Sequence, residues 1–413
     1  MSLPATKTPI SSTPLPSSST SPSNKIHTWQ AFRYHWILWK CCGLQPPKRD
    51  SKWFKPYLIY AIVLNVTVTL MFPITLIIDL ILSQSLTELC ENLYVTITDV
   101  TCNLKFINVF TVRHKLWEVR RILEHLDERA NSPEQRRELR VGIQTSHKWF
   151  MAFLRFYTCA VITSQLVVYL SKERVLMYSS WFPWDWKASK RNFLFAHCYQ
   201  VYTVTVQTVQ NLGSDTYPQA YIVILIAHIR ALGLRIKALG SSLSSSSATA
   251  GTSRQFTDDE LYGELVDCVK DHKIIHELFL TIQECISKTC LAQFVATGLA
   301  QCTIGIYILY VGDDFSRLLN SFMFLGAITI EILILCYFGD LYCRANEFLI
   351  DAIYDCNWIE RDERFKKALL LLLQRSQQAT CLMAGSLIPV RLPTFVKIMK
   401  TAYSAFTVLN EVN

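Results

Sequence analysis

Residues 57–78 read YLIYAIVLNVTVTLMFPITLII, without one charged side chain among them. Residues 289–312 form a second charge-free run. Each run has the ~20 residues that a helix needs to cross the roughly 30 Å hydrocarbon core of a bilayer. The composition agrees with this interpretation, because 51% of the residues are hydrophobic and only 18% are charged. The sequence therefore predicts an all-α membrane protein.

The segment 192–229 is too long for one upright span, and Asp215 is its only formal charge. We predict one long helix there, with a kink or an unwound turn at residues 213–218, because Gly and Pro are tolerated in spans where neighbours satisfy the freed backbone groups. The prediction is a seven-transmembrane helical protein, with six spans within 57–343 and a seventh in 393–413. The spans that contain polar or charged residues are 88–112, 149–170, 192–229, 318–343 and 393–413.

The distribution of Lys and Arg predicts the orientation of these spans. One side of the membrane receives 31 Lys and Arg and the other side 6. The positive-inside rule places the richer side in the cytoplasm, so we expect a cytoplasmic N-terminus and an extracellular C-terminus. An eighth span would turn two basic segments outward and weaken this contrast. The richer segments are 1–56, 113–148, 230–288 and 344–392, and the poorer ones are 83–87, 171–191 and 313–317.

Two low-complexity tracts lie on the predicted cytoplasmic side. Residues 1–24, which open the N-terminal segment 1–56, are rich in Ser, Thr and Pro and are expected to be disordered. Residues 240–254 are rich in Ser and predict a flexible loop. Immediately afterwards, Thr257 and Glu260 have the spacing of a capping box. A helix should begin there and run into the span at 289–312.

The region 344–392 is predicted to be a cytoplasmic anchor region. Its stretch 361–378 is helical in pattern but carries several Lys and Arg, which suits packing outside the bilayer. Pro389 and Pro393 should then separate this helix from the final one, because proline interrupts a helix.

Several functional classes lack support in the sequence. The net charge of +8 is explained by the orientation, so nucleic acid is not an expected partner. No CxxC spacing occurs among the fourteen cysteines, which speaks against a zinc site or a disulfide framework. The phosphate-binding, metalloprotease and serine-hydrolase motifs are missing as well. We therefore expect no enzyme, no metal and no cofactor.

Charged residues inside the predicted spans are the best functional pointers, because such groups are costly in hydrocarbon and mark water-filled paths or paired sites. The alternative is an inter-helical ion pair near one rim of the membrane. These residues are Asp99, Lys105, Arg155, Asp215 and Glu331.

A G-protein-coupled receptor is the main alternative for a seven-span chain. That class has an extracellular N-terminus, an acid–Arg pair closing span three, an Asn-Pro motif in span seven and a disulfide to the outer loop. Here span three ends in Tyr169-Leu170-Ser171, without an acid–Arg pair. Span seven lacks the Asn-Pro motif, and the outer loop 171–191 has no cysteine. The distribution of Lys and Arg also predicts the opposite orientation. A secondary transporter is a third candidate, but the internal repeats frequent in transporters are not found.

Several motifs carry a resemblance to a known family. They are Tyr354-Asp355-Cys356-Asn357-Trp358, the Tyr403-Ser404 pair near the end, WFPWDW at 181–186, and Asp215 within its long span. Together with length and inverted topology, these features resemble the insect odorant receptors over nearly the whole chain. The pattern is similar to that of a tuning subunit, because Ser404-Ala405-Phe406 stands where the shared coreceptor has Thr-Tyr-Phe.

The resemblance implies a heterotetrameric, odorant-gated, non-selective cation channel formed with the coreceptor in the plasma membrane of olfactory neuron dendrites. It also implies that the final helix lines the pore, with Val408 and Val412 at hydrophobic gate positions and Glu411 at the neighbouring polar position. Lys397 and Lys400 on the same helix are unfavourable to cations.

In this family, volatile odorants bind in the outer halves of spans two, three, four and six. The corresponding stretches are mostly apolar and aromatic with a few hydroxyls, which is typical of small-molecule pockets. Packing or an interfacial aromatic belt is the alternative role for each such residue. The implied ligand-binding residues are Tyr94, Ile97, Thr98, Thr163, Ser164, Val167, Phe195, Tyr199, Tyr202, Phe322, Phe324 and Leu325.

Overall fold

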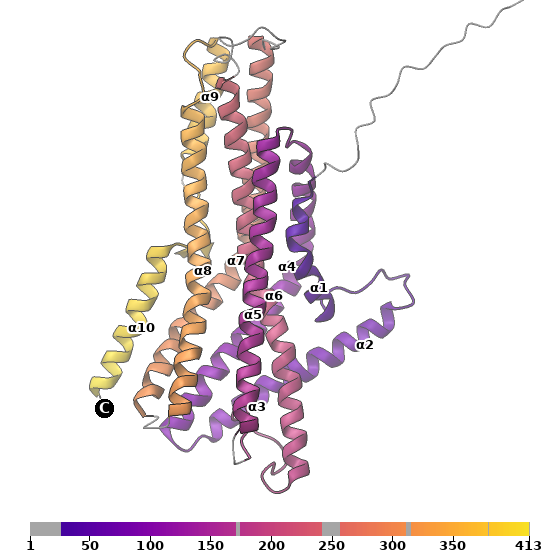
Figure 1. The fold of residues 1–413 in the computed structure, drawn as a ribbon, viewed down its shortest axis with the longest axis vertical. Coiled ribbons are helices and arrows are strands. Elements are labelled where there is room, and N and C mark those ends of the chain that lie inside the picture. The colour runs from indigo at the N-terminus through magenta and orange to yellow at the C-terminus, as the bar shows by residue number, and fades with distance from the viewer. Residues whose placement is uncertain (1–25, 171–173, 242–256, 311–314, 379, 413) are drawn as a thin grey trace, which may run out of the picture.

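The computed structural model describes residues 26–170, 174–241, 257–310, 315–378 and 380–412. The tract 1–24 and almost all of the loop 240–254 therefore lie outside the described residues. So do the side chains of 167, 170, 240, 241, 315, 316 and 409–412. The described chain is a bundle of long helices (Figure 1). They are η2 (Thr28–Phe32), α1 (Arg33–Cys41), α2 (Phe54–Asn65), η3 (Val66–Leu70), α3 (Met71–Leu82), α4 (Leu86–Glu128), α5 (Pro133–Leu170), α6 (Lys190–Ser241), α7 (Asp258–Tyr310), α8 (Phe315–Tyr354), α9 (Glu363–Ser376) and α10 (Leu392–Val412).

The first predicted span is continuous from α2 through the π-helical turn η3 into α3. Pro73 lies just after that turn and has no N–H to offer the carbonyl of Thr69. A wider i→i+5 turn is a frequent local adjustment within an α-helix. The segment is therefore one helix of 29 residues, Phe54–Leu82, with a local irregularity at its centre.

The helix α6 is helical throughout 213–218, so of the two predicted alternatives the unwound turn is wrong, and the kink stays a prediction. Pro218 lies inside the helix and leaves the carbonyl of Ser214 without its usual partner. Every residue from Leu212 to Leu225 is buried among other helices. Opening a turn in such surroundings would leave further backbone groups unpaired, which is more costly than the one bond that proline removes. The prediction of one long helix is confirmed.

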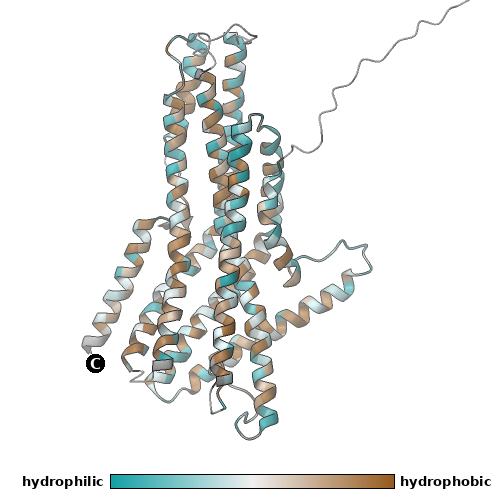
Figure 2. Ribbon diagram, in the orientation of Figure 1, coloured by the Kyte–Doolittle hydropathy of each residue, from teal (hydrophilic) through white to brown (hydrophobic). Residues whose placement is uncertain are grey.

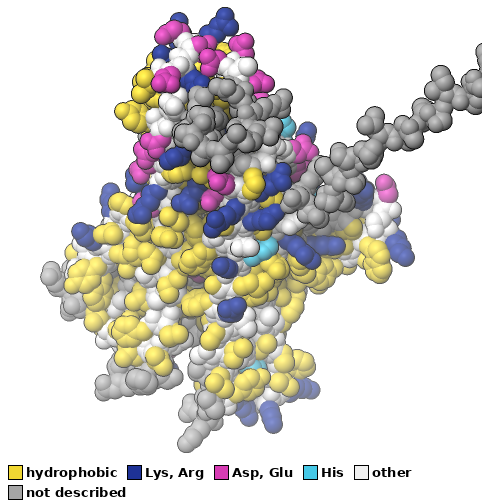
Figure 3. Space-filling model, turned by 45° about the horizontal axis from the view of Figure 1, so that its top comes forward, with side chains coloured by type: hydrophobic (Ala, Val, Ile, Leu, Met, Phe, Trp, Pro, Cys, Tyr) yellow, Lys and Arg dark blue, Asp and Glu magenta, His cyan; other side chains and the backbone are white. Residues whose placement is uncertain are grey.

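The helices α4 to α8 are much longer than a bilayer is thick. The 53 residues of α7 span about 80 Å at 1.5 Å per residue. Hydrophobic residues dominate the lower part of the bundle in Figure 2, and hydrophilic ones become frequent toward the upper end. We call this upper end the stalk; it contains residues 113–148, 230–241, 257–288 and 344–378. Lys and Arg gather in a band between the hydrophobic body and the stalk (Figure 3).

Three helices of the described chain qualify as spans by length and apolar composition alone: Phe54–Leu82, Asp258–Tyr310 and Arg317–Tyr354. The other predicted spans carry more polar side chains. In α6 many of these face the bundle interior, since Gln200, Thr203 and Gln210 are all buried. Average hydropathy therefore understates how apolar the outer faces of these helices are.

Two local predictions in the stalk are confirmed. Thr257 Oγ1 accepts a hydrogen bond from Glu260 N at 3.3 Å, and Glu260 Oε2 accepts one from Thr257 N at 3.0 Å. This capping box begins α7, which continues into the predicted span. The helices α9 and α10 are separate, as predicted, although α9 already ends at Ser376 and Pro393 is the second residue of α10. A hairpin of β1 (Met383–Ala384) and β2 (Ile388–Pro389), which the sequence analysis did not predict, joins them.

The helices pack in a defined order around one main core. The most extensive helix–helix contacts are those of α4 with α7, α5 with α6, and α6 with α8, while α10 lies against α7 and α8. The largest fully buried side chains include Tyr217, Tyr221 and Phe338. This arrangement brings polar residues of five helices to one place inside the bundle.

Candidate functional site

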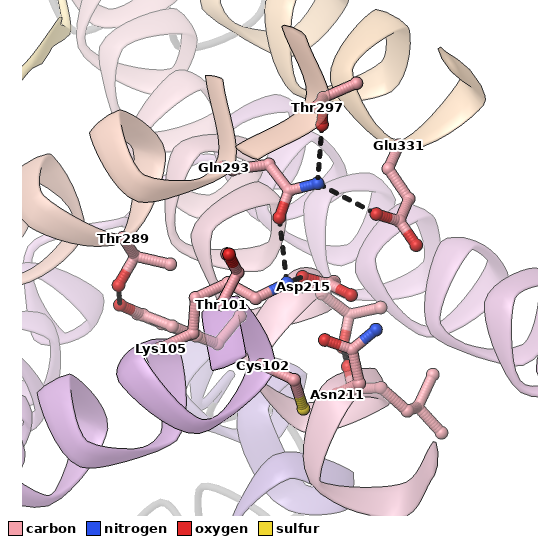
Figure 4. A network of polar contacts seen from close by, with 12 residues as sticks. Thr101, Cys102, Lys105, Asn211, Asp215, Thr289, Gln293, Thr297 and Glu331 are labelled. Atoms are coloured by element: carbon pink, nitrogen blue, oxygen red, sulfur yellow. Dashed lines mark hydrogen bonds and ion pairs between the residues drawn. The ribbon is translucent and has the colours of Figure 1, made fainter. Parts of the chain in front are cut away.

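A buried polar network joins α4, α6, α7 and α8 (Figure 4). Lys105 Nζ of α4 forms an ion pair with Asp215 Oδ1 of α6, and the two side chains are only 3% and 6% exposed. The same ammonium donates to Gln293 Oε1 of α7 at 2.8 Å. Gln293 Nε2 then donates to Glu331 Oε2 of α8 at 2.9 Å and to Thr297 Oγ1 at 3.2 Å. One glutamine thus links the ion pair to a second carboxyl group.

Tyr157 brings α5 into the same network. Its hydroxyl lies 2.6 Å from Asp215 Oδ2 and 2.5 Å from Glu331 Oε1, and it accepts a hydrogen bond from Asn211 Nδ2 at 3.0 Å. A phenol has one hydrogen, so it can donate to only one of the two carboxyl groups at a time. Satisfying both contacts requires one further proton shared among Tyr157, Asp215 and Glu331. The network thus holds one cation, two carboxyl groups and a phenol within hydrogen-bonding distance of both carboxyl groups.

The network connects five helices through side-chain contacts. A buried ion pair is a weak source of net stability, because desolvation offsets the attraction. Removing one partner, however, leaves an unpaired charge in a low dielectric and typically costs about 3–5 kcal/mol. A relative movement of these helices must therefore keep or re-form the contacts as a unit.

The structure changes the interpretation of the five intramembrane charges. Lys105 and Asp215 form an inter-helical ion pair, the alternative given for such residues, and Gln293 links this pair to Glu331. Asp99 is buried separately and accepts a hydrogen bond from Asn103 at 3.3 Å. Arg155 is exposed on α5 and joins neither group. Sequence reasoning missed Tyr157 and Gln293, because an uncharged side chain in a span gives no signal until its neighbours are known.

Four of the predicted ligand-binding residues meet in one aromatic cluster between α4, α7 and α8. Tyr94 has its ring centroid 5.0 Å from that of Phe324 and 6.0 Å from that of Tyr307. Ile97 and Leu325 pack at its edge. Tyr307 donates to Glu91 Oε2 at 3.1 Å. We call this group the Tyr94 cluster; Tyr307 was not predicted.

Two other predicted residues lie on a different side of α4, beside the first span. Tyr199 donates to the Thr67 carbonyl at 3.0 Å, and its ring lies 6.5 Å from that of Phe72. Tyr202 Oη lies 3.5 Å from Thr67 Oγ1 and is partly exposed. Val95 packs against both this group and the Tyr94 cluster, so it stands between them.

The segment 174–189 covers the end of this region and supplies residues that the sequence analysis did not select. Gln200 Nε2 donates to the Tyr178 carbonyl at 2.7 Å, and Trp181 N donates to the Thr75 carbonyl at 3.1 Å. The Tyr178 hydroxyl is hydrogen-bonded to Ser164. One sequence feature could have pointed to Tyr178 and Phe182: this segment between two spans is rich in aromatic residues.

The remaining predicted ligand-binding residues do not join either group. Phe195 and Phe322 are exposed on α6 and α8, and Thr163 is exposed with its hydroxyl bonded to the Cys159 carbonyl at 2.9 Å. The Thr98 hydroxyl bonds to backbone carbonyls within α4. The side chain of Val167 lies outside the described residues.

The helix α10 has two different faces. On one face Ala402 is buried, Met399 Sδ lies 3.2 Å from Gln301 Nε2, and Cys302 Sγ donates to the Ala402 carbonyl at 3.4 Å. The opposite face borders an open hollow in the described chain and mixes lysines, hydroxyls and small apolar side chains. Its residues are Pro393, Val396, Lys397, Lys400, Thr401, Ser404, Ala405 and Val408. The side chains of Glu411 and Val412 lie outside the described residues.

Comparison with known proteins agrees with this architecture. Over 390 residues the chain is 38% identical to odorant receptor 2a of Drosophila melanogaster, covering 93% of this chain and 97% of that one. It is 31% identical to odorant receptor 19a of the same species, over 94% and 98% of the two chains. The solved olfactory receptor OR5 from Machilis hrabei, in complex with eugenol, superimposes with a TM-score of 0.78 at 16% identity, over 93% of this chain and 98% of that one.

The likeness to the solved receptor confirms the predicted all-α, seven-transmembrane fold. The G-protein-coupled alternative is not supported. Residues 85–403 match the family described as 7tm odorant receptor. With this match and the near full-length relatives, the chain belongs to the 7tm odorant receptor family.

Proposed function

We propose that this chain is the odorant-binding, tuning subunit of a ligand-gated, non-selective cation channel that it forms with a coreceptor. Its place is the plasma membrane of olfactory neuron dendrites. The stalk and the N-terminus face the cytoplasm, which the Lys and Arg band above the hydrophobic body supports.

The observation that carries the channel proposal is the asymmetry of α10. One face is held by α7 through Gln301, Cys302 and Gly305, whereas the face with Lys400, Ser404 and Val408 contacts no other helix in the described chain. A face with cations and hydroxyls is unsuited to lipid but suits water. Copies of this helix from several subunits would enclose an aqueous pore.

Within that pore, Val408 and Val412 would form the hydrophobic constriction and Glu411 a cation-attracting ring near the outer mouth. Val408 is 56% exposed in the single chain, so its side chain is available for contacts with other subunits of an assembly. Val412 is four residues further on and belongs to the same helical face. Hydrophobic constrictions gate by dewetting, and carboxylate rings favour cations.

The ligand is proposed to be a small volatile molecule, mostly apolar, with an aromatic or aliphatic body. The Tyr94 cluster and the Tyr199 group, separated by Val95, offer rings and a few hydroxyls of the kind that small-molecule pockets use. The Machilis receptor was solved with eugenol, a molecule of this class. About 10 heavy atoms at roughly −0.5 kcal/mol each give an affinity near 10⁻⁴ M. Low selectivity follows, because one methylene changes binding by only about 1–3 kcal/mol.

The proposal is tested by coexpressing the chain with the coreceptor and recording currents to a panel of volatile odorants. Odorant-evoked cation current that needs both subunits supports it. An N-terminal epitope that stains only after permeabilisation supports the orientation. Staining of intact cells, or a response that needs a G protein, contradicts the proposal.

The role of α10 is tested by Lys400→Gln. Removing a cation from the unpartnered face should raise cation conductance or shift the calcium permeability ratio, without changing the half-maximal odorant concentration. Lys367→Gln on α9 is the matched control, because it removes an exposed charge from the stalk. Equal permeation in both variants, at equal surface expression, removes this face of α10 from the pore.

A further inference from the structure

The segment between α9 and α10 is attached to α7 by hydrogen bonds to its own backbone groups. The Gln283 side chain accepts from Met383 N at 2.9 Å and donates to its carbonyl at 2.6 Å, as a neighbouring strand would. Gly385 N donates to the Ser287 carbonyl at 3.0 Å. We call residues 380–391 the connector. Because α10 begins at Leu392, the position of the connector sets the position of α10.

The other side of the connector lies against α8 at very close range. A Cβ placed on Gly339 would stand 1.9 Å from the Val390 carbonyl oxygen, so only glycine fits there. At the other end of the connector, Tyr342 Oη donates to Thr380 Oγ1 at 3.0 Å. The next residues along each segment, Cys343 of α8 and Cys381 of the connector, also interact through their thiols, and Cys381 Sγ lies 3.5 Å from the Leu382 carbonyl oxygen.

The surroundings of this thiol pair favour a thiolate at Cys381. The hydrogen bond from the Cys343 thiol, helped by the Arg391 guanidinium, lowers the pKa of Cys381 to about 7, although burial acts in the opposite direction. Asp340 holds Arg391 nearby, with Nε 3.5 Å from Oδ1. Both cysteines are half-buried and carry free thiols. A low-pKa, accessible thiolate with a second thiol in contact is the arrangement found in redox-sensitive sites.

We propose that Cys343 and Cys381 are a modification site, a dithiol that hydroperoxides oxidise to a disulfide. The Cys381 thiolate attacks one oxygen of hydrogen peroxide and releases hydroxide, which leaves a sulfenic acid on Cys381. The Cys343 thiol then attacks that sulfur, the S–S bond forms, and the sulfenic oxygen leaves as water with the thiol hydrogen. Two thiol groups lose two electrons in total, and peroxide is reduced to water and hydroxide.

The bond would tie α8 covalently to the start of the connector. The connector already contacts α7 through Gln283 and α8 through Gly339, so a covalent link fixes it between both helices. Any movement of α10 that needs the connector to slide along α8 is then restrained. The chemistry itself does not depend on the proposed channel function; the effect on current does.

Mass spectrometry tests the bond on the full-length chain purified with its coreceptor. After peroxide and alkylation of remaining thiols, a disulfide-linked peptide pair containing Cys343 and Cys381 is expected, with loss of alkylation at both positions. Dithiothreitol should restore both thiols. Arg391→Gln should slow the reaction and Arg391→Lys should keep most of it, because the second variant retains the cation. Full alkylation of both thiols after peroxide, in protein that stays monodisperse, overturns the proposal.

Electrophysiology tests the consequence separately. Peroxide should reduce the odorant-evoked current, with recovery after dithiothreitol, and Cys343→Ser and Cys381→Ser should each abolish that sensitivity. Cys41→Ser, which removes an exposed thiol far from the connector, should keep it. A disulfide found by mass spectrometry without a change in current overturns the restraint on α10. If no odorant-evoked current exists in untreated protein, the proposed channel function fails while the dithiol result still stands.

Discussion

Phe406 of α10 packs directly on Gly305 of α7, where an added Cβ would stand 2.8 Å from Phe406 Cδ2. This close approach is one of the contacts that hold the proposed pore helix to the bundle. It also shows why a residue with no side chain is needed at this position of a span.

Gly305→Val should push α10 away from α7 and alter gating. The added side chain overlaps the Phe406 ring, and overpacking of this kind typically costs about 1–3 kcal/mol. We expect smaller odorant-evoked currents, or constitutive leak, at equal surface expression in voltage-clamp recordings. Gly298→Val is the matched control, since a Cβ there meets nothing within 4 Å. Equal effects of both variants would show that the contact with Phe406 is unimportant.

Lys105→Met should strongly destabilise the protein, because it leaves Asp215 buried without its cation. The expected loss is about 3–5 kcal/mol, visible as a lower midpoint in a thermal unfolding assay followed by size-exclusion chromatography. The double variant Lys105→Met/Asp215→Leu should recover much of the loss, because both charges are gone. Arg155→Met, on an exposed residue of α5, should have little effect. An unchanged unfolding midpoint for Lys105→Met would contradict the role given to the ion pair.

Phe324→Ala should change the ranking of odorants, whereas Phe322→Ala should not. Phe324 lies against Tyr94, while Phe322, two residues earlier on the same helix, is 53% exposed outside the cluster. The two variants remove the same side chain from α8, so they control for general damage. Dose–response curves for a panel of volatile ligands provide the measurement. Unchanged curves for Phe324→Ala would place the ligand site elsewhere.

Thr257→Ala should loosen the beginning of α7 in the stalk. It removes the hydrogen bond from Glu260 N, and loss of such a cap typically costs about 1 kcal/mol of helix stability. Amide hydrogen exchange over residues 258–264 should become faster. Thr281→Ala is the control, because Thr281 is half-buried in the middle of the same helix and its hydroxyl donates to the Glu277 carbonyl at 3.0 Å, away from the cap. Faster exchange in both variants, or in neither, would contradict the capping role.

Several features of this protein follow from local sequence. The charge-free run 57–78 predicts a span whatever surrounds it, because transfer into hydrocarbon is a property of the side chains themselves. The same is true of the capping box at Thr257 and Glu260, where both partners are three residues apart. Pro393 in the first turn of α10 is also a local feature, since proline is tolerated at the beginning of a helix.

Tertiary structure alone decided the contacts between residues far apart in the chain. Lys105, Tyr157, Asp215, Gln293 and Glu331 come from five different helices, and no spacing rule links them. The path of α6 through Pro218 was also a tertiary outcome, because burial on all sides made an unwound turn costlier than one missing bond. Likewise Phe324 and Phe322 are the same residue type in one span, and only the packing of α4 against α8 separates a cluster residue from an exposed one. Hydropathy and helix propensity are properties of single residues and their neighbours in sequence, whereas a site depends on which helix faces pack against each other.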